Sequence, residues 1–174
     1  MSAGGYSIRA GTATDLPRLA EIERDAAQLF RSIGYDFCAD GPVRDEAEQR
    51  RALEDGTVLV AETPDGDVAG FALLWRVDGR AHLLELAVAQ RHQKRGLGAR
   101  LVGRAERWAR EERLGELTLT TFRDVSWNAP FYETLGFRVF DPGPERTELR
   151  AVQREERLSG FAKKQRVAMR KPLV

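Results

Sequence analysis

The feature that most constrains the fold is a glycine-containing turn between an apolar strand and an amphipathic helix. The strand covers residues 83–88, and the turn lies within the segment "QKRGLG" at 93–98. From Gly98 to Glu112 apolar residues recur at the helical period, and residues 117–122 form the next apolar run. A strand, a helix and a strand in this order make a crossover connection. We therefore expect the two strands to be parallel neighbours.

The rest of the chain supplies the other elements of an α/β domain, predicted to span residues 1–174 as a single unit. Strands are expected at 6–11, 137–140 and 165–173, and three consecutive strands within 57–88, with PDGD and VDGR as turns. Helices are expected at 12–30, capped by Thr14 or Asp15 with Pro17 in the first turn, and at 44–54, 128–136 and 147–158. Residues 31–42 are predicted to be an aromatic, glycine-containing loop. The consecutive strands indicate an antiparallel meander.

Composition excludes several classes of protein. The chain has 174 residues and a formal charge of +1, from 28 basic and 27 acidic side chains, so no overall field attracts nucleic acid or a membrane. One cysteine and two histidines are too few for a disulfide framework or a structural zinc site. The N-terminal segment lacks the apolar core of a signal peptide, and no apolar run reaches the roughly 18 residues of a membrane span. These observations predict a cytoplasmic protein without a metal.

The glycine turn occupies a position that favours anion binding. The first N–H groups of a helix have no internal partner, and the helix dipole adds partial positive charge there, so a pyrophosphate would fit. The dinucleotide pattern requires a third glycine where Leu101 stands, and the triphosphatase pattern requires a Gly-Lys-Ser or Gly-Lys-Thr sequence that is absent here. The alternative is that Gly96 and Gly98 only permit a tight turn between strand and helix.

Two segments resemble a known family. "LAVAQRHQKRGLGARLV", with Gln93, Gly96 and Gly98, is similar to motif A of the GCN5-related N-acetyltransferase (GNAT) superfamily, and "NAPFYETLGF" is similar to its motif B. The order of elements from Tyr6 to Phe140 matches as well. The resemblance implies the GNAT fold, with helices flanking a mixed, mostly antiparallel sheet of about seven strands that contains a splayed parallel pair. It also implies an enzyme that uses acetyl-CoA and no metal.

The resemblance assigns the cofactor site to one continuous segment. The backbone of the strand, at Leu86, Ala87 and Val88, would pair with the pantetheine arm. The turn and the start of the helix would hold the pyrophosphate, through Gln93, Lys94, Arg95, Gly96, Leu97, Gly98, Ala99 and Arg100. The three cations of this segment are alternatively solvated side chains that make no phosphate contact.

Catalytic roles also follow from the resemblance. Tyr132 matches the family's acid, which donates a proton to the leaving thiolate. On the strand "AHLLELAV", which together with "APFYETLGF" resembles the arylalkylamine N-acetyltransferases, His82 is preferred as the base or a water relay and Glu85 as a substrate contact. Strict alternation places His82 and Glu85 on opposite faces unless a bulge intervenes. Each also has a structural alternative: a packed tyrosine, a core histidine, or a glutamate that caps a backbone group.

One position departs from the family pattern. Val125 stands where many members have an asparagine that contacts the cofactor, and Asn128 is better interpreted as the N-cap of the short helix.

The acceptor is predicted to be a primary amine of a small molecule, acetylated by direct attack in a ternary complex. Phe30, Tyr35 and Asp36, between the first two helices, would contact it, although these residues suit a small local core equally well. A protein N-terminus or a lysine is an alternative acceptor. A non-catalytic acyl-CoA-binding module or a nucleic-acid-binding module is the alternative function, and the charge near zero argues against nucleic acid as a partner. The expected oligomeric state is a monomer or a homodimer.

Overall fold

The computed structural model describes residues 5–160 and 166–174. Seven strands pair in the order β1-β2-β3-β4-β5-β7-β6. β4 (Arg80–Val88) runs parallel to β5 (Glu116–Phe122), with Ala81 opposite Leu117 and Leu83 opposite Leu119, whereas the pairs β1–β2, β2–β3, β5–β7 and β6–β7 are antiparallel. The predicted α/β fold with a mixed sheet and a parallel crossover pair is therefore confirmed.

The chain forms two compact units, described separately below. The first runs to Trp75 and includes Glu85–Ala105, and the second comprises Arg76–Leu84 and the residues from Glu106 onward. Three elements, β3 (Val68–Val77), β4 and α4 (Leu97–Glu111), continue from one unit into the other.

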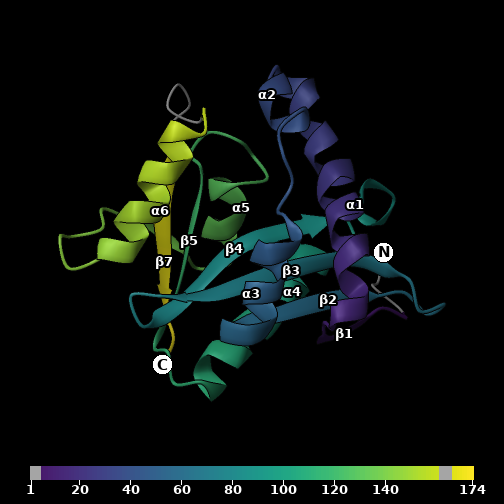
Figure 1. Ribbon diagram of the computed structural model, residues 1–174, viewed down its shortest axis with the longest axis horizontal. Helices are drawn as coiled ribbons and strands as arrows, with labels where there is room; N and C mark the ends of the chain where they lie inside the picture. The colour runs from purple at the N-terminus through teal and green to yellow at the C-terminus, as the bar shows by residue number, and fades with distance from the viewer. Residues whose placement is uncertain (1–4, 161–165) are drawn as a thin grey trace. The chain divides into compact units, whose positions relative to one another are not determined.

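In the first unit, helices cover both faces of the strands. α1 (Leu16–Ala27) and α3 (Glu46–Asp55) lie in front of β1 (Ser7–Ala10), β2 (Thr57–Glu62) and β3 in Figure 1, and α4 lies behind them. Residues Val58–Ala61 and Val68–Leu74 are accordingly buried without alternation. An uninterrupted apolar run of this kind is typical of a strand that has no solvent-facing side.

In the second unit, β5, β6 (Arg138–Phe140) and β7 (Arg166–Pro172) are accompanied by α5 (Ala129–Thr134) and α6 (Thr147–Leu158). The first turn of α6 is capped from the β3–β4 turn, because the Asp78 carboxylate accepts hydrogen bonds from the Glu148 and Leu149 N–H groups at 3.0 and 3.1 Å. These two N–H groups have no acceptor inside their own helix. The cap thus fixes where the predicted helix 147–158 begins.

The structure corrects one local expectation, and it confirms the positions of two predicted helix caps but gives their side chains other partners. The segment predicted as a loop contains the end of a 3-10 helix, Gln28–Ile33, and the short helix α2, Asp36–Ala39; Gly34, with a φ of 75°, ends the first of them. Asp15 lies at the N-cap of α1, but its carboxylate accepts the upstream Thr12 N–H at 2.8 Å, because a 3-10 turn precedes the helix. Asn128 lies at the N-cap of α5, but its side chain accepts a hydrogen bond from the Thr121 hydroxyl at 2.7 Å.

The last predicted strand is observed from Arg166; Gln165, its first expected residue, lies outside the described residues. No helix in the described ranges combines the length and the apolar character that crossing a membrane requires.

Candidate active site

The glycine turn has the backbone of an anion-binding loop. After the 3-10 turn Gln90–His92, Lys94 and Gly96 adopt left-handed conformations with φ of 58° and 75°, and α4 begins at Leu97. The Arg100 N–H donates to the Gly96 carbonyl at 3.1 Å, so the N–H groups of residues 97–99 precede the first hydrogen bond of the helix. Left-handed residues that alternate with others turn successive N–H groups toward one side. Nothing lies within 4 Å of a Cβ built at Gly96, which leaves space over the loop.

Side chains on both sides of the loop hold it in place. Gln93 Nε2 donates to the Val88 carbonyl at 2.9 Å, which ties the loop to the end of β4. The Tyr6 hydroxyl lies 2.8 Å from His92 Nδ1, and the Gln90 N–H donates to the Asp25 carboxylate at 2.7 Å. The residues that lead into the loop are therefore tied to the end of β4, to α1 and to the residue before β1.

The predicted cations differ in their surroundings. Lys94 and Arg95 are exposed. The Arg100 guanidinium donates to the Tyr6 carbonyl at 2.9 Å and so joins the start of α4 to the residue before β1. Arg100 has a structural partner, whereas the other two project from the loop.

The predicted pantetheine strand lies beside a glycine of β3. A Cβ at Gly70 would lie 2.8 Å from the Ala87 carbonyl oxygen and 3.2 Å from Val88 Cα, so only glycine fits there. Ala87 is buried, and Leu86 and Val88 are half-buried.

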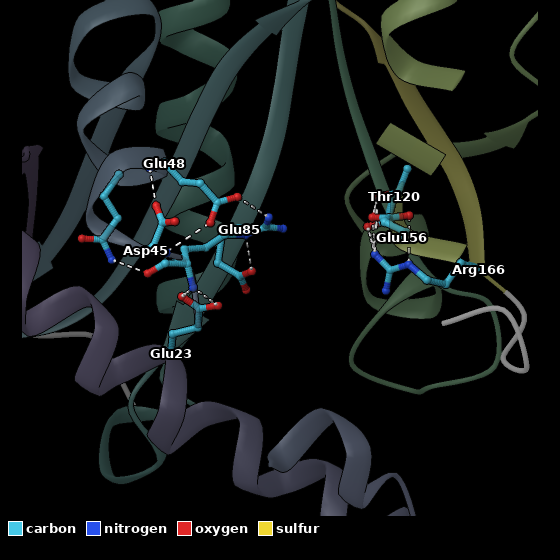
Figure 2. Close-up of polar contacts among 9 residues, drawn as sticks. Glu23, Asp45, Glu48, Glu85, Thr120, Glu156 and Arg166 are labelled. Atoms are coloured by element: carbon cyan, nitrogen blue, oxygen red, sulfur yellow. Dashed lines mark hydrogen bonds and ion pairs between the residues drawn. The ribbon is translucent and has the colours of Figure 1, made fainter. Parts of the chain in front are cut away.

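Glu85, one residue before this segment, belongs to a charged cluster that the sequence did not reveal. Arg44, just before α3, lies between three carboxyl groups. Its guanidinium contacts two of them, with Nη1 3.0 Å from Glu48 and Nε 3.7 Å from Glu85. Its backbone N–H donates to both oxygens of Glu23, at 3.0 and 3.1 Å. Figure 2 shows Glu23, Glu48 and Glu85 close together in the first unit. Burial and, next in size, the charge of Glu85 raise the pKa of Glu23 to about 8.

One sequence signal pointed to Glu23. It occupies a position on the apolar face of α1, between Leu19 and residues 26–27, where a hydrophobic side chain is expected. No comparable signal marked Arg44, which lies in a polar segment typical of a solvated helix.

His82, in the second unit, is buried with 1% of its surface exposed, and pairs with Thr118 in the β4–β5 register. Its Nδ1 lies 2.9 Å from the Thr118 hydroxyl oxygen, and this hydroxyl donates to the Ala81 carbonyl at 3.2 Å. A hydroxyl that donates to a carbonyl can accept a hydrogen bond from a protonated Nδ1, so this pair of contacts is compatible with the Nδ1–H form of His82.

Tyr132, also in the second unit, is buried on α5. Its ring makes edge contacts with Phe131 and Phe137, with centroids 5.1 and 5.7 Å away. Its backbone N–H donates to the Asn128 carbonyl at 3.1 Å, and its own carbonyl accepts from the Phe137 N–H at 3.1 Å. Ring packing and backbone hydrogen bonds together hold this residue in one orientation.

The predicted acceptor residues lie close to one another in the first unit. Phe30 stacks on Tyr35 with ring centroids 6.3 Å apart, and Tyr35 contacts Phe37 at 5.7 Å. Asp36 is exposed and forms an ion pair with Arg31 at 3.3 Å.

The first unit thus holds the loop, the strand segment, Glu85 and the acceptor aromatics, and the second holds His82 and Tyr132.

Comparisons with known proteins identify the family. A model of the acetyltransferase (GNAT) family matches residues 18–137, well over half of the chain. The PaiA N-acetyltransferase of Thermoplasma acidophilum, solved with coenzyme A, aligns with a TM-score of 0.71 at 20% identity and covers 97% of this chain and 99% of its own. A Mycobacterium tuberculosis protein solved with CoA and NLQ gives the same TM-score, 0.71, at 20% identity and 97% and 99% coverage.

A third solved structure matches only in part of its own length. N-acetylglutamate synthase of Neisseria gonorrhoeae, complexed with coenzyme A and N-acetyl-glutamate, has a TM-score of 0.68 at 18% identity, and the match covers 99% of this chain and 36% of that one. Identities this low show a common fold, and the family match adds the class of enzyme. The chain belongs to the GNAT family of acetyltransferases and is an acyltransferase.

Proposed function

We propose that this protein transfers the acetyl group of acetyl-CoA to the primary amine of a small molecule, by direct attack in a ternary complex. The observation that carries the proposal is the loop at Lys94–Gly96, which has two left-handed residues, follows the bond of Gln93 to the Val88 carbonyl and leads into the first N–H groups of α4. Such a loop suits a diphosphate, since an anion there meets several N–H donors and the positive end of the helix dipole. Gln93, Leu97, Gly98 and Ala99 complete the proposed pyrophosphate site.

Lys94 and Arg95 are proposed to add charge-assisted contacts to the phosphates from outside the loop. Arg100 is proposed to contribute mainly by fixing the start of α4, given its bond to the Tyr6 carbonyl. The backbone of Leu86, Ala87 and Val88 is proposed to pair with the amides of the pantetheine arm.

The reaction requires two proton transfers. An alkyl ammonium with a pKa near 10.4 is neutral in only about one molecule in a few thousand at pH 7, so a base must take its proton before the nitrogen attacks the thioester carbon. The carbon–sulfur bond then breaks, and the thiolate takes a proton from an acid. The products are the N-acetylated amine and free coenzyme A.

We assign the acid role to Tyr132, which is the only tyrosine of motif B. His82 is proposed as the base or as part of a water relay, and its contact with the Thr118 hydroxyl through Nδ1 is compatible with an Nε2 that accepts a proton. Glu85 is proposed to contact the acceptor ammonium. Phe30, Tyr35 and Asp36 are proposed to bind the body of the acceptor, since aromatic rings beside carboxylates suit an amine with an apolar part.

A thiol-release assay with acetyl-CoA tests the proposal, with phenethylamine, putrescine and a peptide carrying a free N-terminus as acceptors. Tyr132→Phe is expected to lower kcat by about 10²–10⁴-fold, the usual contribution of a general acid, while coenzyme A still binds in calorimetry. Glu133→Gln, an exposed neighbour on the same helix, serves as the matched control and should retain full activity.

Turnover with the small amines but not with the peptide supports the proposal. Turnover with the peptide alone would instead make the protein a protein N-terminal acetyltransferase. If coenzyme A binds without turnover of any acceptor in the panel, the assignment of a small-amine acetyltransferase is wrong.

A further inference from the structure

The charged cluster around Arg44 joins three elements of the first unit at Glu85. Glu23 comes from α1, Glu48 from α3 and Glu85 from β4, and the guanidinium and backbone N–H of Arg44 contact all three carboxyl groups. Glu48 is also fixed at the helix start, where its carboxylate accepts the Asp45 N–H at 3.1 Å. Glu23 and Glu85 both contact Arg44, Glu23 through the backbone N–H and Glu85 through the guanidinium.

The charges in this cluster do not balance. One guanidinium faces three carboxylates, which leaves an excess of two negative charges if all of them ionise. Two carboxyl groups that share a partly buried site cannot both ionise easily, and burial favours the protonated form. The raised pKa of Glu23, about 8, agrees with this expectation.

We propose that Glu23 is a positioning residue for Glu85: with Arg44 it fixes the orientation and the charge of the side chain that, on the function proposed above, contacts the acceptor amine. At neutral pH a protonated Glu23 leaves the guanidinium to the carboxyl groups of Glu48 and Glu85. When Glu23 loses its proton, the cluster gains a negative charge beside Glu85. A cationic acceptor is then attracted more strongly.

The first experiment measures the coupling without any turnover. In ¹³C NMR of carboxyl-labelled protein, the titration midpoint of Glu23 is expected near pH 8 in the wild type and lower, by about one unit, in Glu85→Gln, because a neighbouring negative charge is removed. Glu21→Gln on the same helix, which pairs with Arg18 outside the cluster, is the matched control and should leave the midpoint unchanged. An identical midpoint in Glu85→Gln and in the wild type would overturn the proposal.

The second experiment follows kinetics against pH between 6 and 9.5, with phenethylamine as the acceptor. In the wild type KM for the amine is expected to fall about three- to tenfold through pH 8, and Glu23→Gln should abolish this inflection while KM for acetyl-CoA stays the same. The glutamine retains an oxygen that accepts the Arg44 N–H, so the fold of the cluster is kept. A purely structural role for Glu23 would change kcat and both KM values without moving the inflection.

The two experiments separate this inference from the proposed function. If the wild type turns over the amine but the inflection persists in Glu23→Gln, the inference is wrong and the proposed function stands. If the wild type acetylates no amine, the proposed function fails, and the NMR titration alone decides whether Glu23 sets the charge of Glu85.

Discussion

At the scale of single residues, Gly56 makes a very tight backbone contact in the first unit. A Cβ built there would lie 1.8 Å from the Leu74 carbonyl oxygen, and the atoms in the way belong to the backbone of β3. A rigid strand cannot move aside as a flexible side chain can. Gly56 therefore fixes how closely the end of α3 approaches β3.

We expect Gly56→Ala to lower the free energy of unfolding by about 2 kcal/mol or more, measured by urea denaturation. Gly103→Ala is the matched control, because Gly103 lies inside α4 with nothing within 4 Å of its Cβ. There the same change should raise stability by about 0.5–1 kcal/mol. Equal effects at the two positions would contradict the packing argument.

Glu23 makes stability depend on pH. The pKa of Glu23 in the folded state is about 8, against an ordinary value of 4.5, so between these values the folded protein keeps a proton that the unfolded chain has lost. Stability must then fall as pH rises through this window. The glutamine of Glu23→Gln does not titrate, so the wild type should lose stability relative to this variant as pH rises. We expect the difference in the free energy of unfolding to shift in favour of the variant by about 2 kcal/mol between pH 5 and pH 8, measured by urea denaturation at each pH. A constant difference across this range would show that Glu23 titrates normally.

The contacts of Glu23 and His82 could not be predicted from the sequence alone. The period of α1 revealed that Glu23 breaks an apolar face, but not that the carboxyl group meets Arg44 and Glu85. Such a meeting depends on how α1, α3 and β4 pack, which no local pattern encodes. His82 was predicted as a base or as a core histidine, and its burial and its bond to Thr118 came only from the structure.

At the scale of elements, the entry into α1 is held by a branched ion pair. Arg9 of β1 makes two parallel hydrogen bonds to Asp15 at 2.9 and 3.0 Å and one to Glu62 of β2 at 2.5 Å. The hydrogen bonds from Arg9 lower the pKa of Asp15, against the opposing effect of burial. Asp15 thereby links the first strand to the first helix.

We expect Asp15→Asn to cost about 1–3 kcal/mol at pH 7, by thermal or urea denaturation. Because the folded pKa of Asp15 is lowered, its contribution is complete above the unfolded value and disappears as pH falls through the folded value. The difference between variant and wild type should therefore shrink below about pH 3.9. Asp65→Asn, in the exposed β2–β3 turn, is the control and should have no effect.

The sequence predicted best the bounds of helices and strands with a strong hydrophobic period. β5, Glu116–Phe122, begins one residue before the expected run, and α6, Thr147–Leu158, has the expected bounds, because hydrophobic periods are local properties. The segment 31–42 was predicted as an aromatic, glycine-containing loop between two helices. Its helical turns depend on aromatic contacts such as that of Phe30 with Tyr35, which only the folded chain provides.

At the scale of the whole molecule, the crossover from β4 through α4 to β5 was readable from the sequence, and the parallel register confirms it. The position of β7 was not readable. It lies between β5 and β6, with Leu119 opposite Met169 and Val139 opposite the same residue from the other side. Pairing between strands far apart in the chain is decided by tertiary packing rather than by local pattern.

The family follows from the match over residues 18–137, and the proposed chemistry depends on one loop. Calorimetric titration with coenzyme A tests that dependence, comparing Gly96→Ala with Gly66→Ala. Both glycines have positive φ, 75° and 85°, and open space at the Cβ, so the backbone strain is matched, but only Gly96 lies in the loop. We predict that Gly66→Ala binds coenzyme A as the wild type does and that Gly96→Ala binds at least about tenfold more weakly, or 1.4 kcal/mol. Equal affinities in all three proteins, or no heat of binding in the wild type, would contradict the account.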